Sequence, residues 1–220
     1  KRLYMTATPR LYSDEIKSKA AQAEAILCSM DDEKLYGQEI YRIGFGGAVE
    51  KDLLTDYKVL ILTLNDQDVP PAVQKMIADR ESEINIEDAP KLIGCINALS
   101  KQILGDEGAV KATDPEPMRR AVAFCQSIAV SKKIKAVFNT ATGAYIDSLP
   151  AEKKEQMVSI AADHIDGTMS APLRDELLGW LKADADDHEC RVLTNVRCLS
   201  EGVDVPSLDA VMFLSARNSQ

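Results

Sequence analysis

From residue 121 onward, short apolar runs alternate with stretches of helical pattern, and this alternation limits the fold more than any other feature. The apolar runs cover residues 121–125, 158–164, 191–194 and 210–214, and helical patterns near 131–138 and 172–181 lie between the first three. Continuous apolar runs of this length are typical of strands buried on both faces of a parallel sheet. The sequence therefore predicts an α/β fold with a doubly wound, mostly parallel sheet.

The chain before residue 121 carries weaker signals. Residues 1–9 and 57–62 have the pattern of strands, and residues 14–28 and 37–54 that of helices, the second interrupted by Gly44, Gly46 and Gly47. Residues 65–118 form a long insertion before the next strand. Its best element is an expected helix whose apolar residues recur at helical spacing, namely Leu92, Ile96, Leu99 and Ile103.

Composition excludes several classes of protein. The content of 45% hydrophobic and 28% charged residues is typical of a soluble globular protein, and no apolar run approaches the ~20 residues of a membrane span. The five cysteines form no CxxC pair, so we expect buried, reduced thiols in a cytoplasmic protein. A net charge of −9 is opposite to the basic surface of an autonomous DNA-binding domain, so the chain alone should bind DNA weakly.

An acidic stretch and a single tryptophan both have ordinary structural interpretations. His188 and Cys190 stand in an acidic stretch, but their spacing differs from the short paired spacings of zinc ligands. We therefore expect residues 184–189 to form a solvated acidic loop and the chain to hold no metal. Trp180, at the end of a predicted helix, is expected to pack in the core.

The last two apolar runs enclose the most specific motif of the chain. Its sequence is Val192-Leu193-Thr194-Asn195-Val196-Arg197-Cys198-Leu199-Ser200-Glu201-Gly202-Val203-Asp204-Val205-Pro206. This layout resembles the fifth motif of superfamily 2 helicases and translocases, which are ATP-driven motors on nucleic acid. The opening Leu3-Tyr4-Met5-Thr6-Ala7-Thr8-Pro9 resembles the third motif of the same superfamily. Residues 121–127 resemble the fourth motif, and residues 164–169 resemble the strand–glycine–helix segment.

The resemblance assigns roles to particular residues. It implies that Thr194 touches a nucleic-acid phosphate and that Gly202 and Asp204 approach ATP across an interdomain cleft. Hydroxyl and backbone N–H groups suit phosphate oxygens, and a carboxylate suits a ribose hydroxyl. The remaining assignments are nucleic-acid contacts by Gln126, Ser127 and Gly167 and interdomain coupling by Thr6, Ala7 and Thr8.

The resemblance also implies a domain organisation. Residues 1–9 would be the last strand of a first RecA-like domain, residues 10–50 a helical connector, and residues 51–220 the second RecA-like domain of a P-loop NTPase helicase, truncated before the sixth motif. The chain has no G-x-x-x-x-G-K-[ST] loop, no acidic magnesium box and no sixth motif with its arginine finger. We therefore expect this fragment alone to be inactive, with ATP and Mg²⁺ bound by the intact protein.

Residues 36–60 indicate a particular subfamily within this superfamily. They look most like the helicase subunits of restriction enzymes, of type III or of the single-chain type I-like kind. That relationship implies an ATP-dependent motor on double-stranded DNA, with the first RecA-like domain in the same chain and nuclease and methyltransferase domains elsewhere in it. A repair or RNA helicase, a non-catalytic RecA-like interaction module and a Rossmann-like transferase remain as alternatives. The transferase would need a glycine-rich loop after its first strand, and none follows Leu62.

Overall fold

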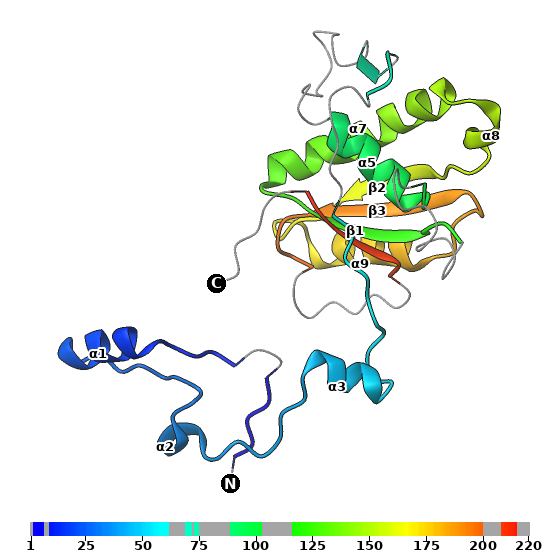
Figure 1. The fold of residues 1–220 in the computed structure, drawn as a ribbon. Helices are drawn as coiled ribbons and strands as arrows, with labels where there is room; N and C mark the ends of the chain where they lie inside the picture. The colour runs from blue at the N-terminus through cyan, green and yellow to red at the C-terminus, as the bar shows by residue number, and fades with distance from the viewer. Residues whose placement is uncertain are drawn as a thin grey trace. The chain divides into compact units, whose positions relative to one another are not determined.

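The computed structural model describes residues 2–6, 9–61, 69–71, 73–74, 89–102, 116–199 and 208–214. The chain divides into two compact units, Lys1–Leu60 and Ile61–Gln220 (Figure 1). Each unit is described by itself. Among the described helices, none is long and apolar enough to cross a membrane.

A four-stranded parallel sheet forms the centre of the second unit. Its strands are β1 (Arg120–Phe124), β2 (Ser159–His164), β3 (Glu189–Asn195) and β4 (Ala210–Phe213), in the order β2-β3-β1-β4. All three neighbouring pairs are parallel. Each strand coincides with one of the four apolar runs to within two residues, which confirms the predicted parallel α/β sheet.

Helices cover both faces of this sheet, as Figure 1 shows for α7 and α5 on one side and α9 on the other. The bounds are α5 Ala89–Leu99, α7 Ile128–Ser148 and α9 Ala171–Lys182, and the short α8 spans Ala151–Lys154. The predicted helix of the insertion is therefore confirmed as α5; its last apolar position, Ile103, and residues 62–68 lie outside the described residues. The sheet is doubly wound, as predicted.

The alternation of side chains along each strand divides the core in two. On β1, Ala121 and Ala123 pack with α5 and α7, whereas Val122 and Phe124 face the α9 side. Small side chains on the first face let two helices approach the sheet closely. Because successive residues of a strand point to opposite faces, this division continues on β2 and β3 up to their polar ends.

Two polar side chains complete backbone hydrogen bonding that the sheet and helices leave open. Asn139 of α7 donates to the Ala162 carbonyl and accepts from the Ala162 N–H, at 2.9 and 2.8 Å, which covers part of the edge strand β2. Arg191 of β3 donates to the carbonyls of Trp180 and Ala183 at the end of α9, at 2.7 and 3.1 Å. Helix C-termini leave carbonyls without intrahelical partners, so this arginine caps α9.

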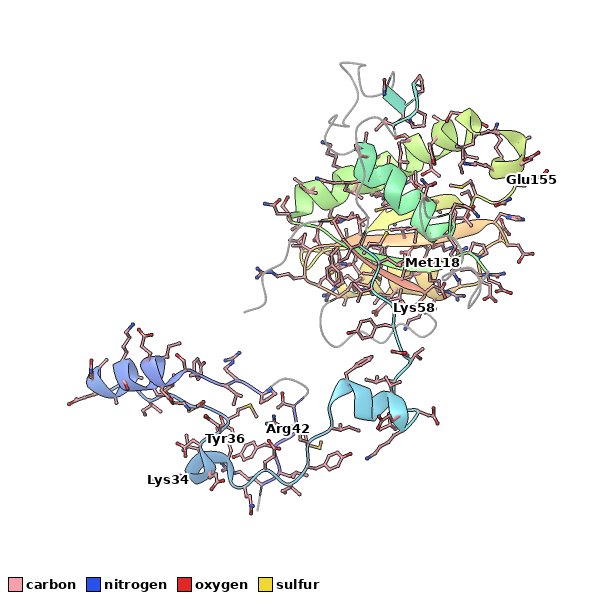
Figure 2. All side chains as sticks on the ribbon, in the orientation of Figure 1. Lys34, Tyr36, Arg42, Lys58, Met118 and Glu155 are labelled. Carbon is pink, nitrogen blue, oxygen red and sulfur yellow. The ribbon has the colours of Figure 1, made fainter. Side chains whose placement is uncertain are left out.

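The first unit has little core of its own. Its helices are α1 (Asp14–Gln22), α2 (Glu33–Tyr36) and α3 (Phe45–Glu50). Local contacts hold them, such as an ion pair between Lys17 and Asp31 at 2.6 Å. Among its described residues only Ser29 and Ala48 are buried. Figure 2 shows the difference, because side chains crowd around the sheet but spread along an open chain near Tyr36 and Arg42.

Several predictions for the first 61 residues are wrong. Residues 2–6 and 57–61 are not strands, and the helices predicted at 14–28 and 37–54 shorten to α1 and α3. A strand requires a neighbour for its backbone hydrogen bonds, and no described segment pairs with either stretch. The predicted interruption by glycines is confirmed at Gly44, which is the N-cap residue of α3, but is wrong at Gly46 and Gly47, which lie within the helix.

The prediction that the cysteines are buried is confirmed for three of the four in the second unit and is wrong for the one in the first. Cys95, Cys125 and Cys190 are buried, Cys198 is partly buried, and Cys28 is exposed in the unit that lacks a core. All five lie in the described residues and none forms a disulfide. Burial raises the pKa of the Cys95 and Cys190 thiols to about 12, so both remain protonated.

The acidic loop is exposed but is not simply solvated. Asp184 and Asp187 pair with Arg120 and Arg119 at 3.2 Å each, and these bonds lie at the amino ends of the strands.

Trp180 is partly buried in the α9-side core, as predicted, and lies against the Arg191 guanidinium at 5.5 Å. Among the described residues no cluster of His, Cys, Asp or Glu is arranged to hold a metal ion.

Candidate functional site

The predicted site residues of the second unit meet at the carboxyl ends of the strands. Because β1, β2 and β3 are parallel and adjacent, the segments that follow them emerge at one edge of the sheet. Ligands of open α/β sheets gather at this edge. Gln126 and Ser127 follow β1, Gly167 follows β2, and Thr194 is the penultimate residue of β3.

Gln126 and Ser127 occupy the connection from β1 to α7, and both are exposed. The Ser127 hydroxyl accepts a hydrogen bond from the Val130 N–H at 3.2 Å and so caps α7. Ser is among the preferred N-cap residues because its side chain satisfies an N–H that has no helical partner. This connection therefore presents a hydroxyl and the positive end of a helix to solvent.

Gly167 lies in an exposed turn between β2 and α9. A Cβ atom added to it would meet no heavy atom within 4 Å, and its φ is outside the positive range. The backbone conformation at Gly167 is therefore one that other residues also adopt. The open space that remains is compatible with the close approach of a ligand to its backbone.

Thr194 differs from these exposed residues, because its side chain is 0% exposed. Its hydroxyl donates to the backbone carbonyls of Ser131 and Asp163, at 3.0 and 3.2 Å, and lies 2.9 Å from the Ser131 hydroxyl. These contacts join the end of β3 to α7 and to β2. In this arrangement the hydroxyl is directed into the protein.

A chain of buried polar side chains continues from Thr194 to the surface turn. The Ser131 hydroxyl lies 2.7 Å from His164 Nδ1, and His164 Nε2 lies 2.9 Å from Asp166 Oδ2. Asp166 Oδ1 in turn accepts from the Thr168 N–H and hydroxyl, at 2.8 and 2.6 Å. The chain, which we call the buried relay, comprises the buried Thr194, Ser131, His164 and Asp166 and ends at the exposed Thr168.

The carboxylate of the buried relay is ionised at neutral pH. The Thr168 hydroxyl, and after it His164, lower the pKa of Asp166 well below its ordinary value of 3.8, against the opposing effect of burial. Hydrogen bonds to a carboxylate favour its charged form. The exposed Lys132 ammonium, 4.0 Å from Asp166 Oδ2, adds a compensating charge.

The buried relay contains the residue types of a serine hydrolase, but its geometry excludes that chemistry. A catalytic serine must reach a substrate carbonyl beside an oxyanion hole. Ser131 is 0% exposed, and its hydroxyl is enclosed by His164 and Thr194. The arrangement can therefore hold elements together but has no access to a substrate.

Sequence reasoning missed Ser131 and its bond to His164. A signal was present, since Ser131 stands four residues after Ser127 and therefore on the same side of α7. His164 and Asp166 belong to the segment whose resemblance predicts a strand, a glycine and a helix, and both are 3% exposed and hydrogen bonded to each other.

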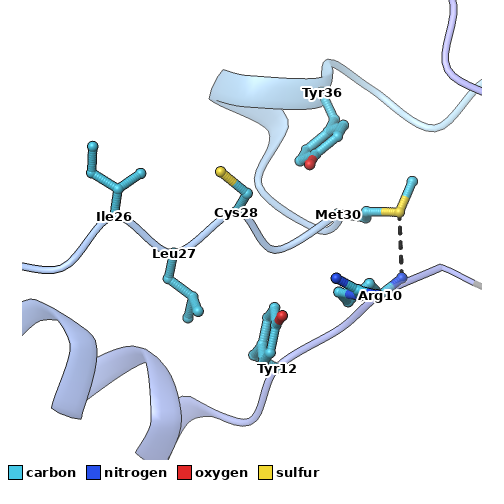
Figure 3. Close-up of a pocket in the computed structure, with 7 residues that line it drawn as sticks. All are labelled: Arg10, Tyr12, Ile26, Leu27, Cys28, Met30 and Tyr36. Atoms are coloured by element: carbon cyan, nitrogen blue, oxygen red, sulfur yellow. Dashed lines mark hydrogen bonds between the residues drawn. The ribbon is translucent and has the colours of Figure 1, made fainter.

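The other predicted site residues are not brought to this edge by the described structure. Ala7, Thr8, Gly202 and Asp204 lie outside the described residues, and Thr6 belongs to the first unit. A shallow hollow of about 390 Å³ also lies in the first unit, between Arg10, Tyr12 and Tyr36 (Figure 3). It is open and is lined by residues of the first unit alone, so it is not part of the site described in the second unit.

The parallel sheet and the segments at its carboxyl edge define the class of protein. Residues 102–220 match the helicase conserved C-terminal domain, and the chain therefore belongs to that family. A second comparison is more specific. The chain is similar to the ATP-dependent Type ISP restriction-modification enzyme LlaBIII bound to DNA, with a TM-score of 0.73 and 35% sequence identity. The match covers 100% of this chain and 14% of that enzyme, so the chain spans about one seventh of its relative's length. No curated protein matches the chain.

Proposed function

We propose that the chain is the second RecA-like domain in the motor of an ATP-dependent DNA translocase of a restriction-modification enzyme. The observation that carries the proposal is the meeting of Ser127, Gly167 and Thr194 at one edge of the sheet. The similarity to a restriction-modification enzyme over the whole chain supports the same assignment.

In this proposal the carboxyl edge of the sheet follows the backbone of double-stranded DNA. Gln126, Ser127 and Gly167 are exposed there, and hydroxyl groups, backbone N–H groups and helix N-termini are common phosphate ligands. Thr194 supports this surface from beneath through its bonds to Ser131 and Asp163. The domain has a positioning task here and makes no covalent bond to the DNA.

The remaining parts of the motor are proposed in the full-length protein. Gly202 and Asp204 approach ATP, and Thr6, Ala7 and Thr8 couple the two RecA-like domains. ATP and Mg²⁺ are bound mainly by the first RecA-like domain in the same chain. Nuclease and methyltransferase domains complete a cytoplasmic enzyme.

The test is the DNA-stimulated ATPase activity of the full-length protein. We expect Thr194→Ala and Asp204→Ala each to lower stimulated turnover by about tenfold or more, equivalent to about 1.4 kcal/mol of activation free energy. Thr194→Ser is the matched control, because it keeps the buried hydroxyl. If no nucleic acid stimulates ATP hydrolysis by the wild type, the motor assignment is wrong and a non-catalytic interaction module takes its place.

A further inference from the structure

We propose that His164 is a positioning residue that couples the DNA-facing turn after β2 to the nucleotide-facing loop after β3. This inference rests on the proposed function, because coupling has a meaning only in a DNA-stimulated ATPase. The imidazole is the central member of the buried relay, with Asp166 on one side and Ser131 on the other.

His164 is the point at which three separate segments meet. It ends β2, and its two ring nitrogens bond to the following turn through Asp166 and to α7 through Ser131, at 2.9 and 2.7 Å. The Ser131 hydroxyl donates to Thr194 Oγ1 at 2.9 Å, and this bond connects α7 to β3. Each hydrogen bond fixes an angle as well as a distance, so the imidazole sets how the three segments lie relative to one another.

Burial makes this arrangement a stiff one. The side chains of Ser131, Thr194, His164 and Asp166 are at most 3% exposed. In a buried environment of low dielectric constant hydrogen bonds are stronger, and a polar group that loses its partner cannot form a hydrogen bond with water in its place. A displacement at either end of the relay is therefore transmitted through it or opposed by it.

The hydrogen bonds run from one end of the relay to the other. Ionised Asp166 accepts from the Thr168 hydroxyl and lies 2.9 Å from His164 Nε2. Beyond the imidazole, the Ser131 hydroxyl donates to Thr194 Oγ1, and the Thr194 hydroxyl donates to the carbonyls of Ser131 and Asp163. His164 thus joins the carboxylate at the outer end to the hydroxyl groups that reach β3.

The outer end of the relay is exposed and the inner end leads to the motor loop. Thr168, bonded to Asp166, stands beside Gly167 in the turn that we place against DNA. Thr194 stands at the other end, directly before the loop of Gly202 and Asp204. DNA that orders the turn would therefore hold the start of the nucleotide-facing loop in one arrangement.

The experiment compares His164→Gln with wild type in the full-length protein. We expect DNA-stimulated turnover to fall about tenfold, while basal turnover and the Kd for duplex DNA stay within about threefold of wild type. His188→Gln is the matched control, because it makes the same change at the chain's other histidine, which is exposed. It should leave all three quantities unchanged.

A second substitution separates positioning from a purely structural role. Ser131→Ala interrupts the relay on the other side of the ring, and alanine is well suited to a helix. If the two residues act in one relay, the double variant loses no more stimulation than the worse single variant. Equal losses of basal and stimulated turnover together with a lower Tm would overturn the proposal, as would unchanged stimulation. A wild type without any stimulation by DNA overturns the proposed function itself.

Discussion

At the scale of single residues, the carboxyl edge of the sheet has exposed residues and, next to them, a buried residue whose side chain holds neighbouring segments together. Ser127 and Gly167 are exposed, whereas Thr194 is enclosed by hydrogen-bond partners from α7 and β2. The family resemblance assigns all three to nucleic acid without this distinction. The structure therefore gives Ser127 and Gly167 as the sites for substitutions that test contact with DNA directly.

Gly167→Ala should weaken DNA binding without weakening the fold. The added Cβ meets nothing within 4 Å, and φ is not in the positive range, so the free protein accommodates it. A DNA backbone in close contact with Gly167 would meet the methyl group, and we expect Kd to rise by about tenfold, or 1.4 kcal/mol. Fluorescence anisotropy with a labelled duplex measures this change.

Gly179→Ala is the control for that substitution, since its Cβ also meets nothing within 4 Å but lies on α9. It should leave Kd unchanged and stabilise the helix by roughly 0.5–1 kcal/mol. An unaltered Kd in Gly167→Ala would show that the DNA backbone makes no close contact with this turn.

Asp166→Asn should change how stability depends on pH. The folded state lowers the pKa of Asp166 below 3.8, so the ionised carboxylate stabilises the fold above pH 3.8, and this stabilisation is lost as pH falls through the folded pKa. The variant lacks that contribution. Its Tm should lie below wild type at neutral pH, and the two values should converge as the solution becomes more acidic than about pH 4. A constant difference in Tm across this range would contradict the assignment.

At the scale of elements, burial decided which strands and helices could be predicted. The runs that became β1 and β3 are apolar because both faces of these central strands are covered, and this pattern is visible in sequence. Residues 2–6 and 57–61 have similar composition, but composition does not supply the neighbouring strand that pairing needs. Local pattern therefore predicts the sheet of the second unit and fails in the first.

Helix α7 shows the opposite error, because it extends ten residues beyond the predicted end at residue 138. Asn139, Thr140, Thr142 and Gly143 are poor helix formers. Buried Ala141 and Tyr145, the latter bonded to Asn97 of α5 at 2.9 Å, keep this part helical. The spacing of Ser127 and Ser131 indicates the side of α7 on which Ser131 lies, but its partners in the buried relay depend on the register of α7 against β2 and β3.

The junction of β3 and α9 yields a prediction about stability. Arg191 donates to two carbonyls at the end of α9 and stacks on Trp180, so Arg191→Lys keeps the charge but loses the planar contacts. We expect a loss of roughly 1–2 kcal/mol in the free energy of unfolding, measured in urea. Arg119→Lys, whose ion pair with Asp187 is largely exposed, should change it by less than about 0.5 kcal/mol. If both substitutions change the free energy of unfolding equally, the planar contacts of Arg191 add nothing to its charge, and the prediction is wrong.

At the scale of the whole molecule, the charge distribution bears on how much of the proposed DNA contact this chain supplies. The chain carries a net charge of −9. Its acidic loop is paired with arginines at the amino ends of the strands, whereas the first turns of α7 carry Lys132, Lys133 and Lys135 with no acidic residue between positions 126 and 146. Lys135 is already paired with Asp163 at 2.5 Å. The basic surface at the carboxyl edge is therefore small.

The 220-residue chain alone should consequently bind duplex DNA at least about 100-fold more weakly than the full-length protein, because affinity for the phosphate backbone grows with the number of lysine and arginine contacts. In the full-length protein, Lys132→Glu should lower the affinity for duplex DNA and reduce the slope of log K against log salt by about 1. Lys153→Glu makes the same charge change on the exposed α8, and we expect it to change both the affinity and the slope by less. Anisotropy titrations over a range of salt concentrations measure both quantities. Equal affinity of the isolated chain and the full-length protein would mean that this domain holds the duplex by itself, and the division of the DNA contact between two RecA-like domains would be wrong.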